Sequence, residues 1–367
     1  MANVFIRTSL APYRIDTYNA LSEKLNMRMC FYRRIALDQA FDPQWLESLC
    51  SFTPVYLKGI ELGRSSRKLC FGIVRLLLKE RPRIVVVPEF QLVLYQVLLV
   101  RFIFRLKFKI ISMCDDSMDM IGNDNDFSGL HRRLRSFVPK LLDNLLLTTP
   151  AVCNWYKSRF GKGIWLPLIN DGARLRETYH RLLPQAEALL QEYGLESAKT
   201  VLFVGRLVDI KNVQALLRAF GKVVQPAVLI VVGDGPMRGE LEKLAGTIGK
   251  TVLFTGRLEG DALYSWYNVA DLLVLPSLQE PFGAVTDEAL EAGCRVIVSD
   301  RAGSSCLVGP SNGAVWKVDE GESSLASLIE EQLSAAGPRS YPLVLRQSGM
   351  VLNFDETMDR VVKEMES

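Results

Sequence analysis

Short apolar runs rich in β-branched residues alternate with longer, helix-like runs along the whole chain. In the second half these strand-like runs cover residues 200–205, 227–233, 251–256, 271–277 and 294–300. In the first half they cover residues 3–8, 28–33, 83–89, 109–114 and 144–149. Continuous apolar strands separated by helices are typical of a parallel sheet with both faces covered. The sequence therefore predicts an α/β protein built from two doubly wound, Rossmann-like domains.

With 367 residues, the chain is long enough for two domains with separate cores. The join between the two patterns lies within residues 166–197, which include Pro167 and Pro184. We expect an amino-terminal domain over residues 1–170 and a carboxy-terminal domain over residues 171–345. The last segment, residues 346–367, contains an amphipathic helical pattern.

The composition argues against several classes of protein. The seven cysteines are scattered without C-x-x-C spacing and there are two histidines, so neither a disulfide framework nor a zinc site is indicated. The most apolar run, residues 92–100, is much shorter than the about 20 residues that a membrane span needs. The start of the chain lacks the apolar stretch of a secretory signal, so we expect a cytoplasmic protein.

Charge is distributed unevenly between the two halves. Residues 1–170 carry 25 Lys and Arg against 14 Asp and Glu, whereas residues 171–367 carry 19 against 27. A basic half indicates an anionic partner, although two domains can also simply differ in charge. The basic clusters are interleaved with Phe, Ile and Leu at residues 33–34, 64–68, 101–109 and 131–135. Such surfaces bind anionic bilayers from one side, so we expect peripheral attachment to the inner face of the cell membrane. No recognisable nucleic-acid-binding motif accompanies them.

One loop in the second half has the pattern of an anion site. The strand-like run that ends in Ser277 is followed by Glu280, a short stretch containing Gly283, and a helix-like run. A helix start after a strand presents free backbone N–H groups to an anion. Glu280 in the loop and Glu288 in the helix add carboxylate acceptors beside it. This combination suits a sugar diphosphate, whose phosphates need donors and whose hydroxyls need acceptors.

Two cations are expected at the same edge of the sheet. Gly205 and Arg206 close the first strand of the second domain, and Lys211 follows shortly afterwards. Parallel sheets of this type bind ligands at the carboxyl ends of their strands. Fixed cations there would stabilise the charge that grows on a departing diphosphate.

The glycine pair Gly233 and Gly235 follows the next strand. It partly matches a dinucleotide-binding fingerprint, but the third glycine is one position late and a proline removes a backbone donor within the turn. We interpret this stretch as a tight turn that lines a nucleotide site, and not as an NAD site.

Taken in order, these motifs resemble the donor-binding half of the family 4 retaining glycosyltransferases of GT-B fold. The matching stretches are V-G-R-x-x-x-x-K-N, G-D-G-P, F-x-G, A-D-L-L-V-L-P-S, E-P-F-G-x-x-x-x-E-A and A-G-C-R-V-I-V-S-D, within residues 198–335. The resemblance implies two Rossmann-like domains facing each other across a cleft, with the final helix packing back on the first domain. The amino-terminal half resembles polysaccharide-assembly members of the group more loosely.

The resemblance implies roles for individual donor-site residues. Arg206 and Lys211 would hold the diphosphate, Glu288 would accept hydrogen bonds from the ribose, and Glu280 would bind hydroxyls of the transferred sugar. Backbone amides around residues 282–285 would contact the sugar and the phosphate. Arg257 and Leu258, just after the strand-like run 251–256, would contact the base. These further donor residues are Pro281, Phe282, Gly283, Ala284, Val285, Arg257 and Leu258.

The implied reaction transfers a sugar from a UDP- or GDP-sugar with retention at the anomeric carbon, without a further cofactor. In the front-face route that the resemblance favours, the departing phosphate helps to deprotonate the acceptor, Glu280 positions the sugar, and Arg206 and Lys211 stabilise the leaving group. Asp124-Asn125-Asp126 spells a D-x-D triplet, but such matches are frequent by chance and this one lies in a polar loop of the other domain. We therefore expect no metal.

The acceptor side departs from the family pattern. Its first loop, residues 8–14, ends in Arg14 and contains no glycine, and the later strand ends before Asp115 and Asp116, where many members have a histidine. These two acids could orient or deprotonate the acceptor, or they could cap a helix. We expect an acceptor saccharide linked to a lipid diphosphate, of the kind used in capsule or exopolysaccharide assembly. A nucleotide-sugar epimerase and a non-catalytic nucleotide-sugar binding protein remain alternatives of the same fold.

Overall fold

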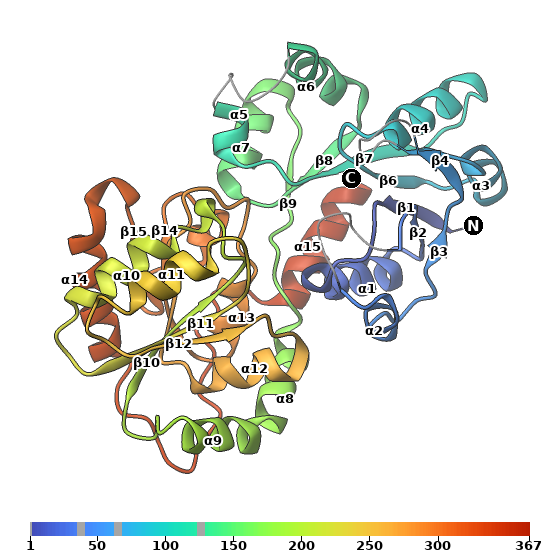
Figure 1. Ribbon diagram of the computed structural model, residues 1–367. Coiled ribbons are helices and arrows are strands. Elements are labelled where there is room, and N and C mark those ends of the chain that lie inside the picture. The colour runs from blue at the N-terminus through green and yellow to red at the C-terminus, as the bar shows by residue number, and fades with distance from the viewer. Residues whose placement is uncertain (1, 35–40, 62–67, 123–128) are drawn as a thin grey trace. The chain divides into compact units, whose positions relative to one another are not determined.

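The computed structural model describes residues 2–34, 41–61, 68–122 and 129–367, with no side chain described for residue 122 or for residues 129–132. The chain forms two compact units (Figure 1). Unit 1 comprises Met1–Asn170 and Phe354–Ser367, and unit 2 comprises Asp171–Asn353. Among the described residues, no helix has both the length and the apolar character to cross a membrane.

Unit 1 is built on a seven-stranded parallel sheet with the strand order β3-β2-β1-β6-β7-β8-β9. The strands are β1 (Asn3–Arg7), β2 (Met27–Phe31), β3 (Val55–Tyr56), β6 (Ile84–Pro88), β7 (Lys109–Cys114), β8 (Asn144–Leu147) and β9 (Ile164–Trp165). A separate antiparallel hairpin consists of β4 (Gly59–Glu61) and β5 (Lys68–Cys70).

Both faces of this sheet are covered, because successive strand residues point to opposite sides. Val4, Ile6 and Val85 belong to a core cluster shared with α3 (Ile73–Glu80), α4 (Leu92–Ile103), α6 (Gly129–Leu141) and α7 (Pro150–Phe160). Phe5 and Val86 belong to a second cluster, shared with α1 (Ile15–Lys24), α2 (Pro43–Ser48) and α15 (Phe354–Glu366). The short helices η1 (Pro12–Arg14) and α5 (Met118–Gly122) complete the unit.

The last helix, α15, packs on unit 1. Its side chains Met358, Val361 and Met365 are buried in the second cluster, and Lys24 pairs with Asp359 at 2.7 Å. The chain leaves unit 2 at Asn353 and not at residue 345, where the sequence predicts the end of the second domain. The difference arises because the Arg346 guanidinium donates to the backbone carbonyls of Tyr267, Ala270 and Ala292, all in unit 2.

Unit 2 contains a six-stranded parallel sheet with the strand order β12-β11-β10-β13-β14-β15. The strands are β10 (Lys199–Val204), β11 (Ala227–Val232), β12 (Val252–Gly256), β13 (Leu272–Leu275), β14 (Arg295–Ser299) and β15 (Gly313–Trp316). The strand pattern of the sequence identifies the first five and misses β15, which is short and begins with a glycine. Strand order reverses at β10, so the loops after β10 and β13 flank the topological switch point, where such sheets bind ligands.

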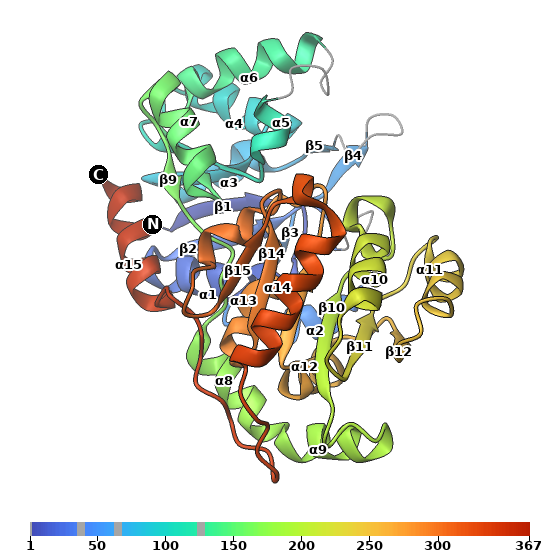
Figure 2. The ribbon, with the colours of Figure 1, turned by 90° about the vertical axis from the view of Figure 1, so that its left-hand side faces the viewer.

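Helices cover both faces of the second sheet. Residues of α10 (Val213–Lys222), α11 (Arg238–Ala245) and α14 (Gly321–Ala335) form one core cluster with it, and Figure 2 shows α10 and α14 side by side in front of the strands. The other helices are α8 (Gly172–Arg181), α9 (Leu183–Glu192), α12 (Gly260–Val269), α13 (Val285–Glu291), η2 (Asp209–Lys211), η3 (Gly303–Leu307) and η4 (Val318–Glu320). The predicted architecture, two doubly wound parallel sheets, is confirmed.

Candidate functional site

The loops that follow β10 and β13 are tied together at the carboxyl edge of the unit 2 sheet. The backbone N–H of Leu278 donates to the carbonyl oxygen of Ile210 at 2.8 Å. The Asn212 side chain donates to the carbonyl oxygen of Pro276 at 3.2 Å, and Asn212 itself adopts a left-handed backbone conformation with a φ of 53°. These two bonds hold the stretch around Lys211 against the loop that carries Glu280.

Lys211 and Glu280 form an ion pair across this junction. The Lys211 ammonium donates to Oε2 of Glu280, and the side chains are 19% and 12% exposed. A charge pair that keeps some contact with solvent can exchange partners, because the attraction between its members is partly screened. The pair therefore joins an available cation and an available carboxylate at one point of the sheet edge.

The stretch from Glu280 to Ala284 is anchored at its base and leaves several amides free. The N–H groups of Gly303 and Ser304 donate to the carbonyl oxygens of Glu280 and Phe282, at 3.1 and 2.7 Å. The Phe282 side chain is buried, whereas Pro281 is exposed. Gly283 has a φ of +94°, and a Cβ there would lie 2.5 Å from Leu275 Cδ2. Within the described chain, the N–H groups of residues 282–284 donate no hydrogen bond. They are available to an anion, as is the start of α13 at Val285.

Glu288 lies in α13 and is held from the neighbouring helix α12. The Tyr267 hydroxyl donates to its Oε2 atom at 2.6 Å. Burial raises the pKa of Glu288 to about 7, against the opposing effects of the Tyr267 hydrogen bond and of the Arg174 charge. Oε1 has no hydrogen bond to any described residue and remains able to accept one from a ligand hydroxyl.

The glycines predicted to form a turn after β11 are required by the packing of two loops. A Cβ on Gly233 would lie 1.8 Å from the Gly205 carbonyl oxygen, and the φ of Gly233 is +148°. A Cβ on Gly235 would lie 2.4 Å from the carbonyl oxygen of Leu207. The Leu207 N–H in turn donates to the Asp234 carbonyl oxygen at 2.9 Å. The turn thus lies directly against the loop that carries Arg206.

The remaining predicted donor residues are more exposed. Arg206 is exposed, and its side chain makes no hydrogen bond or ion pair with any of the described residues. Arg257 pairs with the nearby Glu259, and Leu258 is half-buried. The structure thus joins Lys211 to Glu280 directly. Among the described side chains, no hydrogen bond or ion pair links Arg206 to either of them.

On unit 1, the predicted acceptor-side residues lie at the carboxyl edge of the other sheet. Asp115 follows β7 and accepts from two arginines, Arg14 and, at 2.9 Å, Arg7. Arg14 is only 3% exposed, whereas the Asp115 side chain is 42% exposed. Burial of the carboxyl would raise the pKa of Asp115, but Arg14 and Arg7 lower it below its ordinary value. Asp115 is therefore a firmly ionised carboxylate whose oxygens are both engaged.

Asp116 is enclosed within the unit. It is 1% exposed, and its two oxygens accept from Arg135 and from the Tyr156 hydroxyl, each at 2.6 Å. A carboxylate in this position orients the helices α6 and α7 and has no free oxygen for a substrate. The burial of Asp116 thus favours a structural role, while its predicted acceptor role stays a prediction.

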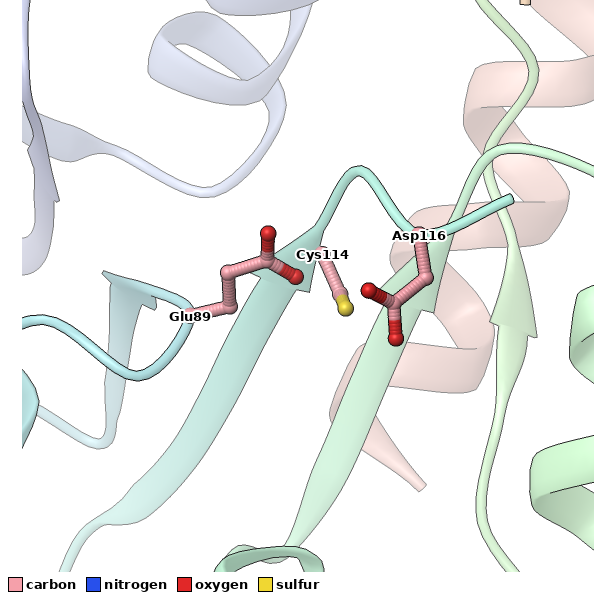
Figure 3. Close-up of side chains that lie close together, drawn as sticks. All are labelled: Glu89, Cys114 and Asp116. Carbon is pink, nitrogen blue, oxygen red and sulfur yellow. The ribbon is translucent and has the colours of Figure 1, made fainter. Parts of the chain in front are cut away.

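Glu89 is a third acidic residue at this edge, and the sequence analysis did not single it out. Figure 3 shows the side chains of Glu89 and Asp116 on either side of Cys114. The pKa of Glu89 is raised to about 8, first by burial and then by the nearby carboxylates of Asp116 and Asp115, against hydrogen bonding with the Cys114 thiol and the charge of Arg7. The available signal was the position of Glu89, an acid directly after a wholly buried strand.

The three side chains in Figure 3 are close enough to be considered as metal ligands. One candidate ligand atom from each of Glu89, Cys114 and Asp116 lies within 4.8 Å of the others. Both Asp116 oxygens are already bonded, one of them to a guanidinium, and burial raises the pKa of the Cys114 thiol. A cation would require ionised ligands with free lone pairs, so this cluster does not suit one. The triplet Asp124-Asn125-Asp126 lies outside the described residues.

The fold has close counterparts among solved structures. The Anabaena protein Alr3699/HepE in complex with UDP superposes with a TM-score of 0.71 at 16% identity, covering 100% of this chain and 95% of that one. The lipopolysaccharide outer core galactosyltransferase WaaB superposes with a TM-score of 0.65, also at 16% identity, covering 99% of each chain. Two parallel Rossmann-like sheets with a final helix are the architecture of the GT-B fold.

Sequence comparison relates the second half of the chain to a known family. Residues 198–334 match the family described as Glycosyl transferases group 1. Over 150 residues the chain is 37% identical to an uncharacterized glycosyltransferase of Methanocaldococcus jannaschii, covering 40% of this chain and 38% of that protein. Over 182 residues it is 30% identical to a GDP-mannose-dependent alpha-mannosyltransferase of Mycolicibacterium smegmatis, covering 49% and 46%. The matches thus span less than half the length of these two relatives. Residues 198–334 thus match the group 1 glycosyltransferases, the stretch in which the motifs predicted this resemblance.

Replacing Gly233 tests the packing of the nucleotide-site turn. We expect Gly233→Ala to lower the free energy of unfolding by about 2 kcal/mol or more, because the new methyl group would meet a carbonyl oxygen and the backbone would be strained. Urea denaturation followed by circular dichroism measures this change. Gly239→Ala is the matched control, since nothing lies within 4 Å of its Cβ position and Gly239 lies in α11. Equal stability of the two variants would contradict the packing argument.

The raised pKa of Glu89 predicts a pH dependence of stability. The unfolded chain releases the Glu89 proton near the ordinary carboxyl pKa, whereas the folded chain keeps it up to a pKa of about 8. The folded state then binds more protons, so this residue lowers stability as pH rises through that window. Glu89→Gln removes the effect, and we expect the variant to gain stability over the wild type from pH 5 to pH 8. If urea titrations give parallel pH profiles of the unfolding free energy for the wild type and Glu89→Gln, this expectation is wrong.

Proposed function

We propose that this protein is a retaining glycosyltransferase that moves a sugar from a UDP- or GDP-sugar to a hydroxyl group of a saccharide. The observation that carries the proposal is the Lys211–Glu280 ion pair at the carboxyl edge of β10 and β13, beside three unbonded amides. This site offers a cation and amides to a diphosphate and carboxylates to sugar and ribose hydroxyls. Two relatives support the class of donor, since one is described as GDP-mannose-dependent and another was solved with UDP-glucose.

In this proposal, the bound donor separates the Lys211–Glu280 ion pair, because its diphosphate and its sugar each bind one member of the pair. The diphosphate draws the Lys211 ammonium, with Arg206 as a second cation from the same loop, and Glu280 turns to hydroxyls of the transferred sugar. Both cations gain most in the transition state, when charge develops on the leaving diphosphate. The amides of Phe282, Gly283 and Ala284 contribute fixed donors, and Glu288 accepts from the ribose through its unbonded oxygen. Retention follows a front-face route in which the leaving phosphate helps to deprotonate the acceptor.

A panel of nucleotide sugars tests the proposal. We expect one UDP- or GDP-sugar to raise the melting temperature of the protein and to be hydrolysed slowly in the absence of acceptor. Lys211→Ala should lower kcat for this hydrolysis by about 100-fold or more, the usual effect of removing a group that stabilises developing charge. Glu280→Gln should keep most of kcat, because the residue positions the sugar and does not attack it.

Distinct outcomes separate the competing functions. Binding without hydrolysis or transfer would indicate a non-catalytic nucleotide-sugar binding protein, and conversion of one nucleotide sugar into another would indicate an epimerase. Complete loss of turnover in Glu280→Gln, with donor binding retained, would instead indicate a nucleophilic role for Glu280. Absence of stabilisation by every member of the panel would contradict the proposed function.

We further propose that the acceptor is a saccharide linked to a lipid diphosphate, for capsule or exopolysaccharide assembly, and that unit 1 binds the inner face of the cell membrane. The helices α3 and α4, which pack on each other, expose apolar side chains together with cations. Phe102 is 81% exposed, Ile103 59% and Leu99 57%. The exposed cations of these helices and of the segment after α4 are Arg75, Lys79, Arg105 and Lys107. We call these seven residues the α3–α4 surface.

The composition of this surface matches an anionic bilayer. Apolar side chains can enter the headgroup region while neighbouring lysines and arginines pair with lipid phosphates. Residues 64–67 and the side chains of residues 131 and 132, which belong to two of the basic clusters expected from the sequence, lie outside the described part of the chain.

Vesicle sedimentation tests the attachment. We expect the protein to co-sediment with phosphatidylglycerol-containing vesicles at low salt and not with pure phosphatidylcholine vesicles. The double variant Phe102→Ser, Arg105→Glu should lose about tenfold or more in affinity, since it removes apolar burial and reverses a charge. Val224→Ser is the matched control, because Val224 is 84% exposed but lies in unit 2. Equal loss in both variants, or no binding by the wild type, would contradict the proposal.

A further inference from the structure

Glu89 occupies a central position at the ligand-binding edge of the unit 1 sheet. It directly follows β6, which lies between β1 and β7 in the strand order. The register pairs Pro88 with Met113, so Glu89 lies opposite Cys114, and Figure 3 shows its carboxyl group directed toward that residue. Parallel α/β sheets bind their ligands beyond the carboxyl ends of such strands.

Glu89 differs from the two aspartates beside it in having an unused oxygen. Asp115 is bonded to Arg7 and Arg14, and Asp116 to Arg135 and Tyr156. The Oε2 atom of Glu89 is buried and has no hydrogen-bond partner in the described part of the protein. A buried polar atom without a partner destabilises the folded state by about 1–3 kcal/mol. An apolar side chain at this position would avoid that cost, so Glu89 is poorly explained by stability alone.

The surroundings of Glu89 indicate what kind of ligand group can form a hydrogen bond with its unpaired oxygen. Its carboxyl group has a pKa of about 8, because burial and then the carboxylates of Asp116 and Asp115 disfavour the charged form. A protonated carboxyl group both donates and accepts a hydrogen bond, as a hydroxyl group does. Two arginines, Arg7 and Arg14, share the carboxylate of Asp115 nearby and so occupy its oxygens. The edge therefore suits a partner rich in hydroxyl groups.

The backbone holds Glu89 in this position. The next residue, Phe90, has a φ of +43°, which is uncommon for a bulky side chain. The Phe90 ring packs against the unit 1 core and lies under the Arg135 guanidinium, at 5.7 Å from its centroid. Arg135 also donates to Asp116, so one guanidinium contacts both Asp116 and the residue that follows Glu89.

We propose that Glu89 binds a hydroxyl group of the acceptor saccharide, and that Glu89, rather than Asp115 or Asp116, is the carboxyl group that contacts the acceptor. The inference rests on the proposed function and specifies the acceptor side of the same enzyme. Asp115 and Asp116 are then positioning residues, which hold Arg7, Arg14 and Arg135 at this edge of the sheet.

Titration of simple glycosides tests the inference on the full chain. The probes are methyl α-D-glucopyranoside, methyl α-D-mannopyranoside and methyl α-D-galactopyranoside, each followed by saturation-transfer NMR with UDP present. We expect at least one to bind the wild type, and Glu89→Ala to weaken that binding by about tenfold, the usual effect of losing one hydrogen bond. Glu89→Gln, which also donates and accepts, should restore the affinity to within about threefold.

The control is Glu80→Gln, which alters a buried carboxyl group in α3 that pairs with Arg28. It should leave glycoside affinity unchanged. If Glu89→Ala does not fold, Glu89→Asp replaces it, because its shorter side chain withdraws the carboxyl group and should also weaken binding. The inference is overturned if no probe binds the wild type, or if these Glu89 variants bind as well as the wild type.

Failure of this inference can be told apart from failure of the proposed function. Hydrolysis of a nucleotide sugar, measured on the same wild-type preparation, reports on unit 2 chemistry alone. Hydrolysis without an effect of Glu89 on glycoside binding would overturn only the role of Glu89. Absence of nucleotide-sugar binding would overturn the proposed function itself.

Discussion

The close approach of the loops after β10, β11 and β13 is the constraint on which the candidate site of unit 2 depends. Gly233 and Gly235 let the turn after β11 pack against the backbone after β10, because any Cβ there would lie within 2.4 Å of a carbonyl oxygen. On the other side of β10, the bonds from Leu278 and Asn212 tie the β13 loop to the same segment. Lys211 can meet Glu280 only because these loops are held in place, and the free amides of residues 282–284 follow from the same arrangement.

The two sheets use their ligand-binding edges differently. At the edge of unit 2, the ion pair between Lys211 and Glu280 is partly exposed, and the neighbouring amides are unbonded. At the edge of unit 1, most charged groups are satisfied internally, by Arg7, Arg14 and Arg135 on one side and two aspartates on the other. This difference fits a unit 2 that holds a highly charged diphosphate and a unit 1 that meets a less charged saccharide.

Much of the fold was predictable, because strand burial on both faces leaves a continuous apolar run that can be read from the sequence. The strand β15 was missed, since four residues beginning with Gly313 carry little pattern. The end of the second domain was placed at residue 345, because nothing in the sequence shows that Arg346 binds three carbonyl groups of unit 2. Boundaries set by single side chains depend on neighbours that are distant in sequence.

For the candidate site, the sequence by itself determined the match of residues 198–334 to the group 1 glycosyltransferases. It also singled out Arg206, Lys211 and Glu280 in loops after strands, and Glu288 in the helix that follows, as candidates. It could do so because glycines, cations and acids at fixed spacings after strands are local features. Only the tertiary structure decided which groups are joined and which are left free. Lys211 pairs with a residue 69 positions away, Asp116 is enclosed by α6 and α7, and Glu89 keeps an unbonded oxygen. The physical reason is that burial and hydrogen-bond satisfaction depend on residues brought together by packing, which local sequence patterns do not encode.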